Sequence, residues 1–334
     1  MSGVEPDVVP GSLAPASPEL TPVQLRVLDD LMARGRPRPR FAPELAADLR
    51  AQLEEAITPL IDETRAGTTI DEGPLWVTKG VLSQVHTCEA HHVDEVQQPF
   101  AWNAGNARGT VAHRALELTL SSRDSPAPLD LVDRAIDSLG ADDPRGVLRP
   151  WLTGATAVEM ADLRSGANDA VSKFIECWPP LKASWTPRTE TRIGADLCDD
   201  RVVLRGKVDL VLGHARGDEA RGLVVDLKTG RAYSSHLDDL RYYALVQTLR
   251  VGVPPFRVAS YYLDTATFHH EDVTADTLAI ATRRTVDGVR KLVELGLGRA
   301  PTITPGPQCG WCRLAASCDG PDGWRRSWAD DDRP

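Results

Sequence analysis

The chain has 334 residues and a net charge of −10, with 42% hydrophobic and 26% charged residues. These proportions are typical of a soluble globular protein with a substantial core. The acidic balance excludes a protein coated in non-specific nucleic-acid contacts, although it permits a local basic groove. The sequence shows no signal-peptide pattern and no apolar run of roughly 18–20 residues, so we predict a cytoplasmic protein without a membrane span.

The N-terminal part predicts a leader and two helices. Proline, small and polar residues dominate residues 1–22, which predicts a disordered leader. A helical extension is predicted over residues 23–72, with one helix over Val23–Arg34 and a second that begins near Pro43. Because a proline inside a helix cannot donate a backbone hydrogen bond, Pro59 should end or kink the second helix. The extension either caps the main domain or binds a partner.

The main domain is predicted over residues 73–322, followed by a polar tail over residues 323–334. From Ser184 onward the apolar period changes from that of helices to that of strands. We predict strands over Trp185–Ile193, Arg201–Leu212, Gly222–Leu227 and Phe256–Leu263, among helices that include Ala155–Cys177, Ser235–Arg250 and Thr274–Leu295. This order of elements predicts an α/β core with helical additions.

Two acids and a lysine stand out in the predicted strands. Asp209 lies in a run with valine and leucine on both sides, and Asp226 ends the next apolar strand. Such a carboxylate has to be paired or bind a metal, because burying it charged and alone costs several kcal/mol. Lys228 follows Asp226 by two residues, which places both side chains on one face of the strand. The three residues indicate either a buried ion pair or a metal-dependent phosphodiesterase centre.

A phosphodiesterase centre of this kind has a definite chemistry. Two carboxylates hold Mg²⁺ or Mn²⁺ through hard oxygen ligands. The metal polarises the phosphodiester and lowers the pKa of a bound water, while the lysine orients that water or stabilises negative charge. His113 lies upstream on a predicted helix, where it shares a face with Glu117. That pair is either a half-buried polar contact or a sign that His113 lies beside the metal.

The order of four motifs carries a family resemblance. The motifs are Gly109-x-x-x-His113, Gly206-x-x-Asp209, Asp226-x-Lys228-Thr229-Gly230 and a helix carrying Tyr243. This order resembles the PD-(D/E)xK nuclease superfamily, in its RecB-like branch, over roughly residues 75–320. The resemblance implies a restriction-endonuclease-like fold. Its mixed sheet core is flanked by helices, with a helical N-terminal extension and a cysteine-rich C-terminal segment.

The resemblance also implies roles for individual residues. The implied metal ligands are His113, Asp209 and Asp226, and the implied catalytic residues are these three with Lys228 and Tyr243. Glu190, on the strand before Asp209, is a weaker match to an auxiliary acid. The family helix carries glutamine four residues before its tyrosine, where this chain has Asp239. That departure affects the expected DNA contact of the helix and leaves the metal ligands unchanged.

A cysteine cluster follows the strand region. Cys309, Cys312 and Cys318 form a Cys-x₂-Cys-x₅-Cys pattern, and a four-thiolate site takes Cys88 as the fourth ligand. The AddB-type and CRISPR adaptation nucleases of the RecB-like branch place one cysteine before the nuclease motifs and three after them. Those four hold a 4Fe–4S cluster that joins the ends of the domain, and the resemblance implies the same here. A structural Zn²⁺ on the same four cysteines is the alternative.

Together these features predict a metal-dependent DNA nuclease, an exonuclease on single-stranded ends with a helicase or a repair or adaptation partner. Its cofactors would be Mg²⁺ or Mn²⁺ and a [4Fe-4S] cluster. The alternative is a non-catalytic DNA-binding or partner-binding module on the same fold. A redox or radical iron–sulfur enzyme is disfavoured, because no cofactor-binding glycine motif accompanies the cysteines.

Overall fold

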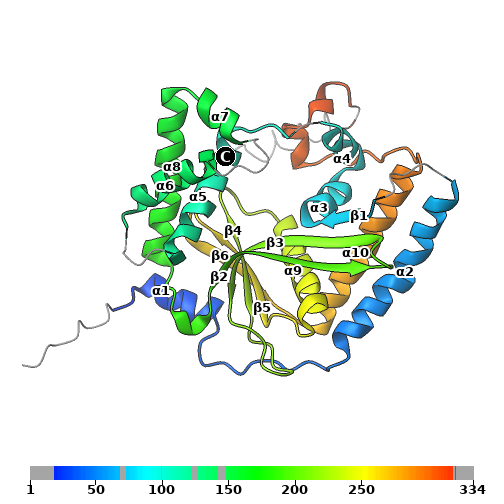
Figure 1. Ribbon diagram of the computed structural model, residues 1–334, viewed down its shortest axis with the longest axis horizontal. Coiled ribbons are helices and arrows are strands. Elements are labelled where there is room, and N and C mark those ends of the chain that lie inside the picture. Colours follow the sequence, from blue (N-terminus) through cyan, green and yellow to red (C-terminus); the bar gives the residue numbers. More distant parts are fainter. Residues whose placement is uncertain are drawn as a thin grey trace, which may run out of the picture.

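The computed structural model describes residues 19–67, 73–98, 100–121, 126–141, 148–318 and 320. Most of the predicted leader and the whole predicted tail lie outside these residues. A mixed sheet lies between two layers of helices (Figure 1), which confirms the α/β prediction. No helix among the described residues combines the length and the apolar character that crossing a membrane requires.

The sheet is built from six strands in the described part of the chain. They are β1 (Leu75–Thr78), β2 (Arg188–Leu197), β3 (Val202–Leu212), β4 (Leu223–Lys228), β5 (Arg257–Tyr262) and β6 (Thr267–Asp272). Their order is β1-β3-β4-β5-β6, and β2 also pairs with β3. The β1–β3 and β4–β5 pairs are parallel, and the other three pairs are antiparallel.

Strand β3 organises the sheet through its two edges. Strand β2 pairs antiparallel with one edge over Val202–Val211. On the other edge, β1 pairs in parallel with Val202–Arg205, and β4 pairs antiparallel with Leu210–Leu212. Residues 206–209 of β3 therefore pair with neither β1 nor β4. The result is a gap on this edge, into which the carboxyl ends of both β1 and β4 point.

Each face of the sheet carries its own helical layer and apolar cluster. One layer comprises α1 (Pro22–Arg26), the π-helical turn η1 (Val27–Leu31), α5 (Ala104–Ser121), α6 (Pro128–Ala141), α7 (Leu148–Gly154) and α8 (Ala157–Cys177). The other comprises α2 (Leu45–Gly67), α3 (Lys79–Thr87), α9 (Ser235–Val251) and α10 (Ala275–Gly296). In β4, Val225 and Leu227 face the first layer and Val224 faces the second. Asp226 and Lys228 alternate with Val225 and Leu227 and so face the second layer.

Proline 59 does not end its helix. Helix α2 continues through Pro59 to Gly67, although an interior proline costs a helix about 3 kcal/mol. Ile57 and Ile61, on either side of the proline, are buried in the same apolar cluster as the sheet. Burial of such side chains contributes about 1.5–3 kcal/mol each, which offsets the lost hydrogen bond. Tertiary packing therefore decides the length of α2.

Two other elements differ from the sequence prediction. The predicted helix over Val23–Arg34 is a short α-helix followed by a π-helical turn, and it ends at Leu31. Strand β6 was missed, because Thr267–Asp272 has only exposed and half-buried positions and contains two histidines. It is an edge strand that pairs with β5 alone, so it has no apolar pattern to detect.

A buried carboxylate anchors the C-terminal segment, residues 299–318, to α4 (Glu89–Val96). Glu89 accepts hydrogen bonds from Arg299 Nη1 at 2.9 Å and from the backbone N–H of Thr302 at 2.8 Å. The Arg299 hydrogen bond lowers the pKa of Glu89 to about 2, against the opposing effect of burial and with help from Thr302. Figure 1 shows the C-terminal segment lying against α4 in consequence.

We expect Glu89→Gln to lower the free energy of unfolding by about 1.5–3 kcal/mol at neutral pH, because a charged hydrogen-bond acceptor is lost. The pKa of Glu89 is depressed in the folded protein, so its contribution is complete above about pH 4.5 and is lost as the pH falls towards 2. Urea denaturation at a series of pH values measures this. Glu95→Gln, on the same helix with a more exposed side chain, is the control. Equal losses in both variants would contradict the prediction.

Candidate active site

The gap on the edge of β3 gathers the predicted acidic and basic residues. Asp209 lies on β3 at the gap, and β4 brings Asp226 and Lys228 alongside it. The backbone N–H of Leu227, which has no strand partner on that side, donates to Asp209 Oδ2 at 2.7 Å. The predicted placement of Asp226 and Lys228 on one face is confirmed, since Lys228 Nζ lies 2.6 Å from Asp226 Oδ2.

Asp226 is held between two lysines. Its side chain is 1% exposed, with Lys228 on one oxygen and Lys79 Nζ on the other at 2.7 Å. Burial alone would raise the pKa of Asp226, but the two ammonium groups lower it to about 2. The carboxylate is therefore ionised at neutral pH and holds both lysines in fixed positions. Lys79 also lies over the ring of Tyr243, 4.8 Å from its centre.

Lys79 was not predicted from the sequence. It is the first residue of α3, directly after β1, and the Thr78 hydroxyl caps this helix by accepting from the N–H of Val81 at 3.2 Å. No motif surrounds Lys79, and its distance from Asp226 along the chain hides the contact. The signal that could have found it is the strand–helix junction itself, because β1 ends at the same gap as β4.

A group of possible metal ligands lies beside the Asp226–Lys228 ion pair. His113, Glu190 and Asp209 each offer a ligand atom, and these three atoms lie within 4.8 Å of one another. His113 Nδ1 is 3.3 Å from Asp209 Oδ1. Burial opposes protonation of His113, but the Asp209 carboxylate and other nearby acids raise its pKa overall. Asp209, Glu190 and Asp226 thus gather negative charge around His113, as expected where a cation binds.

Glu190 takes an unusual backbone conformation to join this group. Its φ is 49°, in the left-handed region that non-glycine residues rarely adopt. The β2–β3 ladder pairs Thr189 with Leu210 and Thr191 with Val208, but it is interrupted at Glu190 and Asp209 between them. Such strain is concentrated at functional sites. Glu190, a weak match by sequence, is thus part of the group, and Lys207 forms an ion pair with it.

Close packing and an ion pair fix the helix that carries His113. A Cβ atom at Gly109 would lie only 3.0 Å from Thr229 Oγ1, so the glycine lets α5 approach the end of β4. One residue earlier, Arg108 donates two hydrogen bonds of 3.0 and 2.9 Å to Asp264, which follows β5. Both contacts hold α5 against the sheet. The spacing from Gly109 to His113, about one helical turn, then brings the imidazole to the site.

Tyr243 is placed beneath the site. Its hydroxyl donates to the backbone carbonyl of Lys207 at 2.7 Å, and its ring is buried. A Cβ atom at Gly206 would lie 2.8 Å from the Tyr243 ring, which explains the glycine in that motif. This geometry makes Tyr243 a support for the β3 backbone at the gap. Its predicted role as a catalytic residue stays a prediction.

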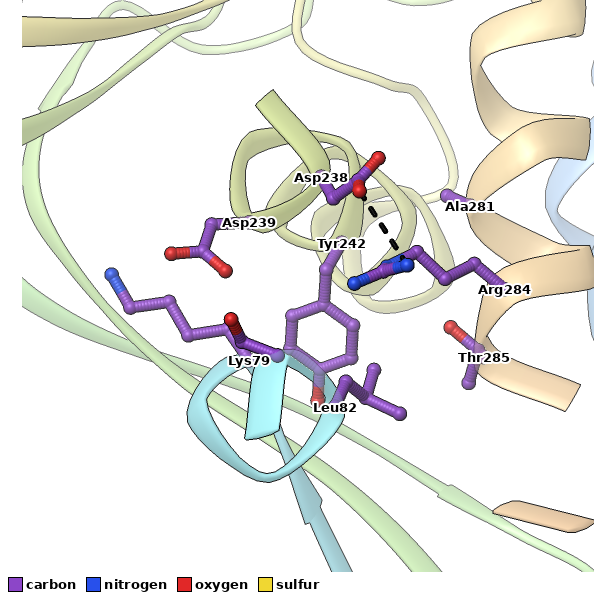
Figure 2. Close-up of a pocket in the computed structure, with 9 residues that line it drawn as sticks. Lys79, Leu82, Asp238, Asp239, Tyr242, Ala281, Arg284 and Thr285 are labelled. Carbon is purple, nitrogen blue, oxygen red and sulfur yellow. Dashed lines mark ion pairs between the residues drawn. The ribbon is translucent and has the colours of Figure 1, made fainter. Parts of the chain in front are cut away.

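Asp239, which stands where the family has glutamine, also faces the site. Its Oδ2 lies 3.7 Å from Lys228 Nζ, and Figure 2 shows its carboxylate next to the Lys79 side chain. Burial raises the pKa of Asp239 above its ordinary value in spite of the two lysines. The residues in Figure 2 line a cavity of about 10 Å³, room for one water. Asp238 closes its far side through an ion pair with Arg284.

The cysteines lie apart from this centre, at the C-terminal segment. The N–H of Thr304 donates to Cys88 Sγ at 3.5 Å, and the N–H of Gly306 donates to Cys309 Sγ at the same distance. Burial, with Cys309 and Cys88 nearby, raises the pKa of the Cys312 thiol. Within the described residues, no three cysteine sulfurs come within 4.8 Å of one another.

Comparison with known proteins identifies the family. The sequence model of the PD-(D/E)XK nuclease superfamily matches residues 79–319. The chain belongs to this superfamily. The match confirms the predicted restriction-endonuclease-like fold and spans the gap with its acids and lysines. No curated protein matches the sequence.

Two solved structures show distant likeness to this nuclease-family chain. One is a proposed exonuclease from Eubacterium rectale, with 11% identity and a TM-score of 0.45 over 72% of this chain and 87% of the other. The other is the protein SSO0001, with 12% identity and a TM-score of 0.33 over 80% of this chain and 95% of the other.

We expect Lys79→Met to lower the free energy of unfolding by about 1.5–3 kcal/mol, because the buried Asp226 carboxylate loses one of its two charged partners. Lys79→Arg keeps the charge and should lose less. Chemical denaturation measures both. Lys182→Met, which removes an exposed lysine, is the matched control and should change stability by less than about 0.5 kcal/mol. A Lys79→Met variant as stable as the control would refute the prediction.

Proposed function

We propose that this chain is a metal-dependent DNA nuclease of the RecB-like branch that acts as an exonuclease on single-stranded ends. One observation carries the proposal. A group of possible metal ligands, His113, Glu190 and Asp209, lies next to the Asp226–Lys228 ion pair in the gap of the sheet. A helicase, or a repair or adaptation complex, would supply the single strand.

The residues of the group fit a divalent cation. Two carboxylates supply the hard oxygen ligands that suit Mg²⁺ and Mn²⁺, and one imidazole adds a nitrogen donor. The family pattern assigns Asp226 as a ligand, and it lies on the neighbouring strand close enough to influence the His113 pKa. Glu190 adds a carboxylate that the pattern assigned only weakly. When bound, the metal would polarise the phosphodiester and lower the pKa of a water.

Lys79 and Lys228 contribute through their position and their positive charge. Asp226 fixes the Lys228 ammonium, which can orient a water or stabilise the charge that develops on the phosphate. Lys79 pairs with the other Asp226 oxygen. The negative charge of Asp226 is therefore shared between two lysines, and Lys228 keeps part of its positive charge for the phosphate. Tyr243 holds the β3 backbone beneath both. This arrangement is rigid before substrate binds, as electrostatic catalysis requires.

We also propose that Cys88, Cys309, Cys312 and Cys318 hold a 4Fe–4S cluster. Backbone N–H groups already point at the sulfurs of Cys88 and Cys309, as they do around iron–sulfur clusters. A single tetrahedral Zn²⁺ needs four sulfurs about 2.3 Å from one ion. The cluster would join the C-terminal segment to the start of the domain at Cys88.

We expect wild-type protein with Mn²⁺ or Mg²⁺ to shorten labelled single-stranded DNA from its ends faster than duplex DNA. Lys228→Met should retain Mn²⁺ binding but lose at least about 100-fold in cleavage rate, because it removes the ammonium group and none of the proposed metal ligands. Glu190→Gln should weaken Mn²⁺ binding, followed by electron paramagnetic resonance of the free ion, by about tenfold. Asp226→Ala should abolish cleavage.

The matched control is Asp276→Asn, which changes an exposed acid on α10 and should leave both measurements unchanged. Equal cleavage by wild type, Asp226→Ala and Lys228→Met would remove the proposed centre. Metal-dependent DNA binding by the wild type without cleavage would favour the non-catalytic module instead.

The cysteine proposal has its own test. Protein purified without oxygen should be brown, with a broad absorption band that bleaches on reduction. Cys88→Ala and Cys312→Ala should each lose this band and lower the thermal midpoint. Cys177→Ala, which changes a cysteine outside the set, should keep the band. A colourless protein that carries stoichiometric zinc would overturn the cluster.

A further inference from the structure

A large cleft lined by exposed aromatic side chains lies between β1, α4 and the C-terminal segment. Its volume is about 930 Å³. Three large aromatic side chains line it, and each is more than half exposed: Trp76 55%, Phe100 62% and Trp311 64%. Soluble proteins rarely gather exposed aromatic side chains on one surface unless a ligand covers them. The cleft is therefore a binding surface.

Amide side chains supply the polar part of the same cleft. Gln84, Gln98, Asn103 and Asn106 line it. The side-chain oxygens of Gln84 and Asn103 already bond to His92 and to the N–H of Asn106, which leaves their NH₂ groups to donate. Charged groups are few. Arg313 is paired with Asp94 at 3.0 Å. Aromatic faces combined with amides match the faces and edges of nucleobases better than they match phosphate groups.

Two elements lead from the cleft to the active site. Trp76 on β1 precedes Lys79 by three residues, about 10 Å along an extended strand. Asn106 on α5 precedes His113 by seven residues, about 10 Å along a helix. At about 3.4 Å per stacked nucleotide, this distance corresponds to about three nucleotides.

A cation lies where the strand would turn from the cleft towards the gap. The Arg205 guanidinium is 5.5 Å from the centre of the Trp76 ring, and it forms an exposed ion pair of 3.2 Å with Asp196 that a phosphate can replace. Arg205 is also the last residue of β3 that pairs with β1 before the gap begins. It can therefore contact a phosphate between a base on Trp76 and the metal ligands.

We propose that this cleft binds single-stranded DNA by stacking its bases on Trp76, Phe100 and Trp311, and leads the strand into the active site. The proposal rests on the proposed nuclease function and names the surface that binds its substrate. A duplex keeps its bases stacked on each other and cannot use these aromatic faces, so the cleft selects single strands. Because stacked bases supply most of the contacts and Arg205 contacts a single phosphate, the affinity should fall with salt concentration by a slope of about one phosphate contact.

The test measures binding without cleavage. The protein is purified with the proposed iron–sulfur cluster in place. It is then titrated into labelled oligodeoxythymidylate without added divalent metal, and fluorescence anisotropy gives the Kd. Trp76→Ala, Phe100→Ala and Trp311→Ala should each weaken binding by about 5- to 100-fold, the measured effect of losing one stacked base. Trp76→Phe and Trp311→Phe should restore most of the affinity. Duplex DNA should bind weakly to all of them.

Two controls keep the proposal falsifiable. Val158→Ala removes an exposed apolar side chain on α8, outside the cleft, and should bind like wild type. If Trp311→Ala disturbs the neighbouring cysteines, Trp76→Ala and Phe100→Ala still decide the result. Wild-type affinity in both would overturn the proposal.

Hydrolysis of a small substrate distinguishes a failure of the cleft proposal from a failure of the proposed nuclease function. Bis(p-nitrophenyl) phosphate is too short to reach from the metal ligands to the cleft. Trp76→Ala should hydrolyse it with unchanged kcat, while its KM for the oligonucleotide rises by about 5- to 100-fold. A wild-type protein that hydrolyses neither substrate would refute the nuclease function. Unchanged KM for the oligonucleotide in an active variant would refute the cleft alone.

Discussion

The buried carboxylate of Asp226 is the constraint on which the site depends. A charged group that is 1% exposed is stable only with partners, and this one has two ammonium groups at 2.6 and 2.7 Å. Those contacts fix the end of β4 to the start of α3 and hold Lys228 beside Asp209. Loss of Asp226 would therefore leave two half-buried lysines without their shared partner, as well as removing a possible metal ligand. Stability and chemistry are coupled through one side chain.

The sheet creates room for this group by leaving one edge of β3 partly unpaired. Because β1 and β4 share that edge end to end, four residues of β3 between them pair with neither strand. Side chains then take over backbone hydrogen bonds, as Asp209 does for the N–H of Leu227. The left-handed backbone at Glu190 lies directly across β3 from the gap. Strain, missing strand pairing and clustered charge thus occur at the same point, as is typical of active sites.

Local spacing in the sequence was enough to predict much of this centre. Period-2 alternation placed Asp226 and Lys228 on one face, and the motif order indicated the superfamily. Contacts between distant segments could not be predicted in this way. Lys79 reaches Asp226 only because β1 pairs with β3, and α2 passes through Pro59 only because its neighbours are buried. Both depend on tertiary packing, which no local pattern encodes.

The C-terminal segment forms one side of the proposed substrate path. It carries Trp311, which forms one wall of the cleft, yet its placement does not rest on the cysteines alone. Glu89 binds it through Arg299 and Thr302, and Arg313 binds α4. These charged contacts position the wall even before a cluster is bound. A cluster at Cys88 would then add rigidity, and a rigid wall reduces the entropy lost when bases stack on it.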